Sequence, residues 1–340
     1  MLKETFNNKT ILVTGGTGSF GKALISNIIS KYSNFKKLIV FSRDELKQHE
    51  MLQNKIYQHK NLRMILGDIR DFRSIKRALQ TVDIIIHAAA LKQVPTAEYN
   101  PFQFIQTNVI GSQNLIEAAL DTNVSQVVAL STDKASSPIN LYGATKLCLE
   151  KLFVSANNIK GKKRINFSVV RYGNVIGSRG SVIPYFLKRF KNDKILTVTD
   201  PKMTRFNINL NQAVNLVYNS LKYSNSGEIF VPKIPSFKIT DLVKAITNNN
   251  KFKIVGIRPG EKLHEELVSI YEGYSTVEFK DYYAILPSNN KNEINAYCKK
   301  TKAKKVGNNF CYTSDKNPDF LTVNDLKKII KKELPNMTDA

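Results

Sequence analysis

The chain has 340 residues, of which 42% are hydrophobic, so it is long enough for one large domain or two smaller ones with a substantial core. No run approaches the roughly 20 apolar residues of a membrane-spanning helix, and the first residues show no signal-peptide pattern. The 51 Lys and Arg against 28 Asp and Glu give a net charge of +23, which raises the question of a nucleic-acid partner.

The basic residues are scattered along the chain, and their densest clusters, at 299–305 and 327–332, lie near the C-terminus. No nucleic-acid motif accompanies them, so we expect a solvated basic surface, no nucleic-acid partner and a modest steering of anionic substrates. The isolated Cys148, Cys298 and Cys311 have no C-x-x-C spacing, which indicates a reducing compartment and no metal site. These features predict a cytoplasmic protein that does not enter a membrane.

Short apolar runs alternate with helical patterns over the first half of the chain. Strands are expected at 10–14, 37–41, 62–66, 83–87, 126–130 and 166–171, with helices between them, for example at 101–121 and 141–157. Strands joined by helical crossovers predict an α/β fold with a doubly wound parallel sheet, whose ligand lies at the carboxyl ends of the strands. After residue 173 the pattern loosens, and a strand at 228–231 and a helix at 240–246 indicate a smaller α+β lobe.

A glycine-rich turn, G-x-x-G-x-x-G, follows the first predicted strand and opens a helix. Its residues are Gly15, Thr17, Gly18, Ser19, Phe20 and Gly21, with Gly16 between the first two. Glycines here let the backbone approach a pyrophosphate that the helix N-terminus stabilises. The alternative is a tight turn without a ligand; the context of strand, loop and helix favours a dinucleotide and a Rossmann sheet.

The end of the second strand carries Ser42 and Arg43, with Lys47 one helical turn further on. A site selective for NAD usually places a carboxylate there, whereas a hydroxyl and two cations suit the 2′-phosphate of NADP. We therefore expect NADP. In the alternative interpretation Arg43 stacks on the adenine and Asp44 holds the ribose.

Four further residues or pairs at strand ends are candidates for the cofactor site. Asp68, beside Ile69, accepts a hydrogen bond from the adenine amino group or else caps the following helix; both alternatives are open. The small Ala88 after His87 allows close approach to the cofactor, and His87 itself is expected to be a core residue. Lys92 is placed to reach substrate or cofactor, and Asn108 to bond a backbone carbonyl and hold the architecture of the site.

The segment from Thr132 to Lys146 concentrates chemical groups. Tyr142 and Lys146 lie four residues apart, so they share one face of a helix, and a phenol beside an ammonium can lose its proton more easily. Together with Thr132 they form a set suited to proton transfer during hydride chemistry. Asp133 and Lys134 add a second acid–base pair that simple carbonyl reduction does not require, and an exposed ion pair is the alternative.

Long strings in the sequence carry a family resemblance that extends over about residues 8–270. They are AALKQVPTAEYNP at 89–101, STDKA at 131–135, PINLYGATKLC at 138–148, RYGNVIGSRGSVIP at 171–184, TDPKMTRF at 199–206 and GIRPGEKLHE at 256–265. With these strings the chain resembles the inverting UDP-N-acetylglucosamine 4,6-dehydratases, which are extended short-chain dehydrogenases/reductases and open the pseudaminic acid pathway used to glycosylate flagella.

The resemblance implies a reaction. NADP takes a hydride from C4 of UDP-N-acetylglucosamine while Tyr142 takes the hydroxyl proton, Lys134 removes the C5 proton, and Asp133 protonates the leaving 6-hydroxyl. Hydride returns to C6, and a proton added to the other face of C5 gives UDP-2-acetamido-2,6-dideoxy-β-L-arabino-hexos-4-ulose. For Lys134 to act as a base, we expect burial and Lys146 to lower its pKa.

The resemblance also implies a substrate site and a division of the chain. The substrate residues it implies are Lys92, Thr132, Asn174, Ile183, Thr199, Arg258 and Glu261. Residues 1–173 would form the NADP-binding Rossmann domain, with a return of the chain near 206–232, and residues 174–205 and 233–340 the substrate-binding lobe. A homo-oligomer is expected by analogy with the fold.

Two departures and two alternatives accompany this interpretation. The chain reads Arg205-Phe206-Asn207-Ile208-Asn209-Leu210 where Arg-Phe-Trp-Ile-Thr-Leu is expected, and Ser136-Ser137 where Ala-Asn is usual. One alternative is a bifunctional 4,6-dehydratase/epimerase of capsule or O-antigen fucosamine synthesis, but such proteins tend to have Met at the position of Tyr142. The other is a catalytically silent NADP-binding regulator, which would usually lose the Tyr142 and Lys146 set.

Overall fold

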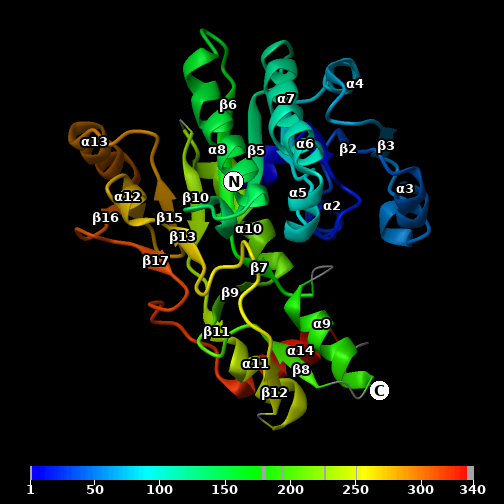
Figure 1. Ribbon diagram of the computed structural model, residues 1–340. Helices are drawn as coiled ribbons and strands as arrows, with labels where there is room; N and C mark the ends of the chain where they lie inside the picture. The colour runs from blue at the N-terminus through cyan, green and yellow to red at the C-terminus, as the bar shows by residue number, and fades with distance from the viewer. Residues whose placement is uncertain (1, 178–180, 193–194, 226, 250, 335–340) are drawn as a thin grey trace.

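The computed structural model describes residues 2–177, 181–192, 195–225, 227–249 and 251–334 (Figure 1). Part of the 171–184 string and of the expected substrate lobe therefore lies outside the described residues. Within them, no helix combines the length and apolar character needed to cross a membrane.

The described residues contain a ten-stranded main sheet in the order β16-β14-β15-β10-β6-β5-β4-β1-β2-β3. Its parallel strands are β1 (Thr10–Thr14), β2 (Lys37–Ser42), β3 (Leu62–Leu66), β4 (Ile84–His87), β5 (Gln126–Thr132), β6 (Asn166–Tyr172) and β10 (Ile229–Pro232). The order reverses between β1 and β4, which is where a doubly wound sheet binds its ligand. The predicted sheet and its strands in the first half of the chain are confirmed.

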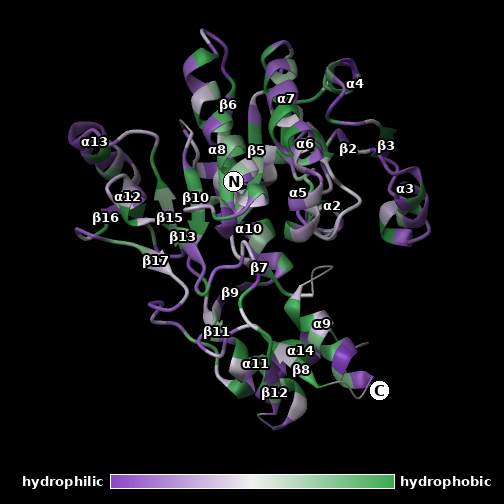
Figure 2. Ribbon diagram, in the orientation of Figure 1, coloured by the Kyte–Doolittle hydropathy of each residue, from purple (hydrophilic) through white to green (hydrophobic). Residues whose placement is uncertain are grey.

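Helices cover both faces of the sheet, which is why its strands read as continuous apolar runs. One face carries α4 (Phe72–Ala78), α7 (Gly111–Leu120) and α8 (Leu141–Ile159), and the other carries α1 (Leu2–Phe6), α2 (Ser19–Lys31) and α10 (Leu210–Tyr223). All residues of β1 and β4 are buried. Figure 2 shows the resulting contrast between the apolar strands and a mostly hydrophilic outer helix such as α13 (Lys291–Thr301).

Short helical segments connect these elements. They are α3 (Glu45–Leu52), η1 (Lys55–Tyr57), α5 (Val94–Tyr99), α6 (Pro101–Phe104), η2 (Ile105–Ile110), η3 (Asp133–Ala135) and α12 (Ile270–Gly273). The helix expected at 101–121 is thus interrupted by η2, a π-helical turn, before α7 begins. Such turns are frequent at functional sites, and this one contains Asn108.

The far edge of the main sheet differs from the expected division of the chain. Three antiparallel strands extend it beyond β10: β15 (Tyr282–Ile285), β14 (Thr276–Glu278) and β16 (Lys304–Lys305). Part of the segment 233–340, expected in the substrate lobe, therefore belongs to the main sheet. β10 leaves its outer edge open to pairing, and these short strands satisfy that edge.

The smaller lobe lies below the main sheet in Figure 1 and has its own core. Its elements include the strands β7 (Asn174–Val175), β8 (Leu196–Val198), β9 (Thr204–Ile208), β11 (Ser236–Lys238) and β12 (Phe252–Ile254), and the helices α9 (Val182–Lys191), α11 (Ile239–Thr247) and α14 (Val323–Glu333). The strands β13 (Glu266–Val268) and β17 (Tyr312–Thr313) pair with each other, and their buried residues belong to the main core. The pair β13–β17 connects this lobe to the η3 turn after β5.

Candidate active site

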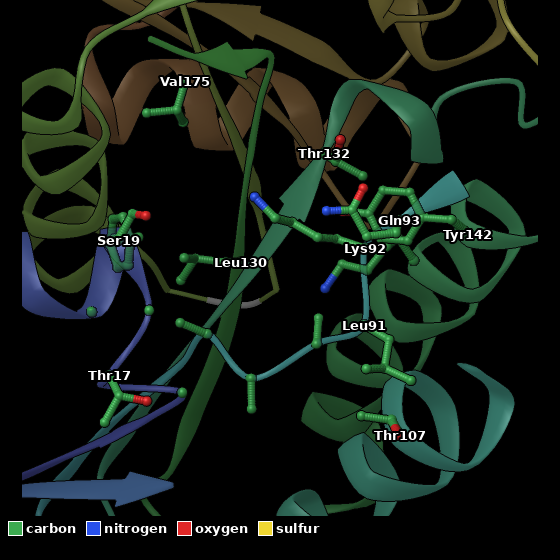
Figure 3. Close-up of a pocket in the computed structure, with 18 of the residues that line it drawn as sticks. Thr17, Ser19, Leu91, Lys92, Gln93, Thr107, Leu130, Thr132, Tyr142 and Val175 are labelled. Carbon is green, nitrogen blue, oxygen red and sulfur yellow. The ribbon is translucent and has the colours of Figure 1, made fainter. Parts of the chain in front are cut away.

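A cleft of about 700 Å³ opens at the carboxyl ends of the parallel strands. That size suits a small-molecule site. Most of the residues expected to bind a cofactor line it: Gly15, Thr17, Gly18, Ser19, Phe20, Gly21, Ser42, Arg43, Lys47, Asp68, Ile69, Ala88, Lys92, Tyr142 and Lys146. Figure 3 shows Thr17 and Ser19 of the glycine loop on one side and Thr132 and Tyr142 on the other.

The glycine loop is shaped for a phosphate group. Gly15 has φ +64°, and a Cβ on it would lie 2.8 Å from the backbone of Ala89, so a side chain is excluded there. Gly18 precedes α2 and brings no side chain to cap it, and no acidic residue lies in the first helical turn. The first N–H groups of α2 thus face the cleft without an anionic competitor, and the loop fits a dinucleotide diphosphate.

The corner of the cleft at the end of β2, where the ribose 2′-substituent is expected, carries both positive and negative side chains. Ser42 Oγ lies 3.0 Å from Thr17 Oγ1. Asp44 accepts a hydrogen bond from the Lys47 backbone and ion-pairs with the Lys47 ammonium, which lowers the pKa of Asp44. Arg43 lies 3.9 Å from Asp68. The two cations expected at this corner are therefore present, and each has a carboxylate neighbour.

Asp68 does not cap the helix that follows it. The N-cap of α4 is Asp71, which accepts hydrogen bonds from the backbone of Arg73 and Ser74. Asp68 instead accepts from the backbone and guanidinium of Arg70. Of the two alternatives for Asp68, the helix cap is excluded.

Asn108 is fully buried and does not line the cleft. Its side chain donates to the Leu91 carbonyl and accepts from the Leu91 N–H, both at 2.9 Å. It also donates to Thr145 on α8 at 3.0 Å. Asn108 thus holds the 88–92 segment against α8 and acts on the cleft through that segment. This agrees with the expectation that Asn108 bonds a backbone carbonyl and holds the architecture of the site.

His87 is a core residue with its ring nitrogens engaged. Nδ1 lies 2.8 Å from Thr14 Oγ1 and Nε2 lies 3.2 Å from Ser112 Oγ. Burial, together with the charge of Lys146, lowers the pKa of His87 to about 3, so its imidazole is neutral. The expectation that His87 serves the core agrees with this geometry.

Tyr142 and Lys146 lie on the first turns of α8, whose N-terminus is capped by the Asn140 side chain accepting from Gly143 N–H at 2.8 Å. Both side chains are buried and line the cleft. Burial raises the pKa of Tyr142 to about 12, although the Lys134 charge opposes this. Burial lowers the pKa of Lys146 to about 8, with Glu150 acting against the shift. The charge of Lys134 thus favours loss of the phenol proton.

Asp133 and Lys134 form η3, directly after β5 and against the N-terminus of α8. Lys134 Nζ lies 3.1 Å from Asp133 Oδ1, which also accepts from Thr132 Oγ1 at 2.8 Å. The Asp133 side chain is 1% exposed, so the pair is no surface ion pair. Burial raises the pKa of Asp133 despite the Lys134 charge.

The environment of Lys134 differs from the sequence expectation. Burial alone lowers its pKa, but the carboxylates of Asp133 and Glu265 more than offset this and leave the pKa of Lys134 above its usual value. Glu265 Oε1 lies 3.4 Å from Lys134 Nζ. Lys146 was expected to lower the pKa of Lys134, but the structure places the acidic Glu265 beside Lys134, and Glu265 raises that pKa. Local spacing could not reveal this neighbour, because Glu265 lies 131 residues further along the chain.

Two residues that follow Glu261 hydrogen-bond to the segment directly after η3, the turn that carries Asp133 and Lys134. Lys262 donates to the Ser136 carbonyl, and the hydroxyls of Ser136 and Ser137 both donate to Glu266 Oε1, at 2.7 and 2.6 Å. The Ser-Ser departure from the family pattern therefore supplies two hydrogen bonds to the β13 segment. The string 256–265 signalled this segment, and within it the family resemblance implied roles for Arg258 and Glu261 but not for Glu265.

The expected substrate residues fall into two groups. Lys92, Thr132 and Asn174 line the cleft. The others lie in the smaller lobe and do not line it: Ile183 is buried in that lobe's core, Thr199 donates to Met203, Arg258 is exposed, and Glu261 lies 3.5 Å from Arg205. The structure thus does not bring these four residues to the cleft.

Comparisons with known proteins show the family to which the chain belongs. A family model described as polysaccharide biosynthesis protein matches residues 11–287. The chain is 48% identical to a UDP-N-acetylglucosamine 4,6-dehydratase (inverting) of Campylobacter jejuni, over 96% of this chain and 98% of the relative. It is 42% identical to a UDP-glucose 4-epimerase of Rickettsia canadensis, over 82% of this chain and 83% of that protein.

Among solved structures, the chain is similar to Pen from Bacillus thuringiensis, with a TM-score of 0.86, 36% identity, and coverage of 96% of this chain and 99% of that one. The long match to the inverting dehydratase, the family model and the shared fold point to the same group. The chain belongs to the polysaccharide biosynthesis protein family of extended short-chain dehydrogenases/reductases, in which its close relatives include inverting UDP-N-acetylglucosamine 4,6-dehydratases.

Proposed function

We propose that this protein is an NADP-dependent UDP-N-acetylglucosamine 4,6-dehydratase that inverts C5 and forms UDP-2-acetamido-2,6-dideoxy-β-L-arabino-hexos-4-ulose. The observation that carries the proposal is the Asp133–Lys134 pair. Lys134 is part-exposed and lines the cleft together with Tyr142, and Asp133 is buried directly behind Lys134. A reductase or a 4-epimerase needs the phenol but has no use for a second acid and base. Elimination of water needs both.

The chain's own groups would move three protons. Tyr142 takes the proton of the 4-hydroxyl, and the resulting 4-ketone acidifies the hydrogen on C5. Lys134 takes that hydrogen as a proton, and Asp133, whose pKa burial raises, gives its own proton to the departing 6-hydroxyl. A proton added to the opposite face of C5 completes the inversion.

NADP, when bound, would accept the hydride from C4 and return it to C6, so that no external reductant is consumed. The glycine loop and the N-terminus of α2 would hold its diphosphate. Support for NADP over NAD comes from Ser42, Arg43 and Lys47 at the cleft corner. A 2′-phosphate would share the two cations with Asp68 and Asp44.

For the substrate, Lys92, Thr132 and Asn174 are proposed to contact the sugar and its phosphate, since they line the cleft. The assignment of Ile183 and Thr199 to the uracil side, of Arg258 to the diphosphate and of Glu261 to the ribose rests on the family resemblance. A guanidinium fork such as that of Arg258 suits a diphosphate. Binding these groups requires the smaller lobe to approach the cleft.

The biological setting is part of the same proposal. We place the reaction at the first step of pseudaminic acid biosynthesis and in the cytoplasm, where the free thiols of Cys148, Cys298 and Cys311 would persist. We also propose a homo-oligomer, by analogy with the fold.

Simple 4-epimerisation is a second candidate, because a relative with 42% identity carries the name UDP-glucose 4-epimerase. The related bifunctional dehydratase/epimerase is the alternative within the dehydratases, and Tyr142 argues against it. A silent regulator is disfavoured by Tyr142 and Lys146, which both line the cleft.

Mass spectrometry together with proton NMR of the sugar nucleotide separates dehydration, epimerisation and the absence of a reaction. Purified protein with bound cofactor is incubated with UDP-N-acetylglucosamine, and in parallel with UDP-glucose. The proposal expects a product lighter by one water from UDP-N-acetylglucosamine. An isomer of unchanged mass would favour the epimerase, and an unaltered substrate would favour the regulator.

A further inference from the structure

Glu265 is a buried acid at the catalytic turn to which the sequence assigned no role. Its side chain is 4% exposed, and Oε1 lies 3.4 Å from Lys134 Nζ and 3.5 Å from Arg205 Nε. Its other oxygen, Oε2, is buried without a hydrogen-bond partner among the described residues, as is Asp133 Oδ2. An orphaned buried carboxylate oxygen is costly, so a purely structural role accounts poorly for Glu265.

The backbone around Glu265 is held firmly. Its N–H donates to Ser314 Oγ at 2.9 Å, and the Ser314 N–H donates to the Glu265 carbonyl at 2.8 Å. Ser314 Oγ lies 2.7 Å from Thr204 Oγ1 at the start of β9. The segments that carry Ser314 and Thr204 therefore hold the Glu265 backbone in place opposite Lys134.

Charged and titratable groups face Lys134 from each element packed against it. Asp133 lies on the same turn, Glu265 precedes β13, Arg205 lies on β9, Tyr142 on α8 and Lys262 on the loop before Glu265. The two carboxylates favour the ammonium form, while Arg205 and burial oppose it. Glu265 is the acid in this group that lies outside the proposed catalytic pair.

We infer that Glu265 is a positioning residue that acts through Lys134 and Asp133, and that its negative charge sets the pH range in which this pair performs the dehydration. The inference rests on the proposed function. Glu265 stabilises the ammonium of Lys134 and raises the pKa of the Asp133 carboxyl.

The working form of the pair holds a neutral amine at Lys134 and the carboxylic acid at Asp133. It forms when one N–H bond of the Lys134 ammonium breaks and the proton passes to Asp133 Oδ1, which lies 3.1 Å away. A further proton on the pair at low pH removes the base, and loss of the Asp133 proton at high pH removes the acid for the 6-hydroxyl. The two steps belong to the pair as a whole and produce a bell-shaped profile.

The test is the pH dependence of kcat in Glu265→Gln, compared with Glu266→Gln. Removing a charge at this distance moves a pKa by about 1–3 units, so both limbs of the Glu265→Gln profile should move to lower pH by at least one unit. Glu266 contacts Ser136 and Ser137 and not Lys134, so its variant should keep the wild-type limbs. A Glu265→Gln profile that is lower in height but unmoved would overturn the inference.

A second pair of variants covers the case in which Glu265→Gln folds poorly. Glu265→Asp retains the charge, so its limbs should stay within half a unit of wild type by the same argument. Arg205→Gln removes a cation that opposes the ammonium, so its limbs should move to higher pH. Shifts of the same sign in Arg205→Gln and Glu265→Gln would contradict an electrostatic role.

A measurement without substrate separates this inference from the proposed function. Only a neutral amine reacts with acetic anhydride, so peptide mass spectrometry of brief labelling at pH 8 reports the neutral fraction of Lys134, with exposed Lys55 as internal standard. Acetylation of Lys134 should rise about tenfold or more in Glu265→Gln and stay unchanged in Glu266→Gln. If labelling responds but no water is lost from the sugar, the proposed function fails alone; if turnover occurs and labelling does not respond, the inference fails.

Discussion

At the scale of single residues, the chemistry of the cleft depends on where three protons reside: on the phenol of Tyr142, the ammonium of Lys134 and the carboxyl of Asp133. Burial raises the pKa of the phenol and of the carboxyl, while the carboxylate neighbours raise the pKa of the lysine. Tyr142 and Lys134 can each accept a proton from the sugar only after they have lost one of their own.

Replacement of Lys134 by Ala tests the proposed base. We expect Lys134→Ala to reduce water elimination by about 100-fold or more, the usual contribution of a general base, while NADP remains bound because the glycine loop is untouched. Mass spectrometry of the product and the absorbance of bound cofactor measure the two effects. Exposed Lys202 supplies the matched control, Lys202→Ala. Full turnover in Lys134→Ala would remove this residue as the base.

Arg43 tests the cofactor preference. Its guanidinium lines the cleft corner, and a lost hydrogen bond to a charged group costs about 1.5–3 kcal/mol. Arg43→Ala should therefore weaken NADP about tenfold to hundredfold and leave NAD nearly unchanged, as measured by calorimetric titration. Arg73→Ala, in α4 and away from the cleft, is the control. Equal losses for both dinucleotides would instead indicate stacking on the adenine.

At the scale of elements, the alternation of apolar runs and helical patterns in the sequence correctly locates the sheet, the glycine loop and the helix α8. It does not predict the π-helical turn η2, because hydrophobic periodicity is nearly the same across one inserted residue. It also does not predict β14–β16, which are short and lie in an Asn- and Lys-rich region. Pairing between segments distant in sequence decides such strands, and composition contains little information on it.

Gly143 couples two of these elements. A Cβ at this position would lie 2.2 Å from the Lys134 carbonyl oxygen, so α8 and η3 pack backbone against backbone. We expect Gly143→Ala to push the turn away from Tyr142, to lower kcat at least tenfold and to lower Tm. Ala144→Gly on the same turn is the control and should cost about 1 kcal/mol in helix propensity only. Wild-type kcat in Gly143→Ala would show that the turn tolerates displacement.

At the scale of the whole molecule, Arg171 joins the sheet to the catalytic helix and to the segment after Glu265. Its buried guanidinium donates to Glu150 on α8, to Glu272 on α12 and to the Leu267 carbonyl on β13. This network crosses from β6 to the elements that carry Tyr142 and Glu265. It therefore fixes the relative position of the two halves of the proposed proton-transfer site.

The network predicts a dependence of stability on pH. Burial would raise the pKa of Glu272, but the charge and hydrogen bonds of Arg171 lower it to about 2 from an ordinary 4.5. Because the pKa of Glu272 is lower in the folded state, its ionised carboxylate stabilises the fold above pH 4.5 by about 3 kcal/mol. This stabilisation is lost as the pH falls from 4.5 to 2. Urea unfolding should show a steeper loss in this window for wild type than for Glu272→Gln. Parallel curves would exclude the contribution.

What the sequence alone can predict also has a limit at this scale. Local spacing places Thr132, Tyr142 and Lys146 at the cleft, where the structure brings them together. It cannot place Ile183, Thr199, Arg258 and Glu261, because their distance from the cleft depends on how the smaller lobe packs. The role of Glu265 is hidden from local spacing for the same reason. Homo-oligomerisation stays a prediction that sedimentation can test.

The stereochemistry and isotope content of the product test the central claim most directly. UDP-N-acetylglucosamine is incubated with the protein and NADP in D₂O, and the sugar is followed by proton NMR. Our account predicts loss of water, one deuterium at C5 and the coupling pattern of the L-arabino product. A C4 epimer that retains its oxygen and carries no deuterium at C5 would contradict it.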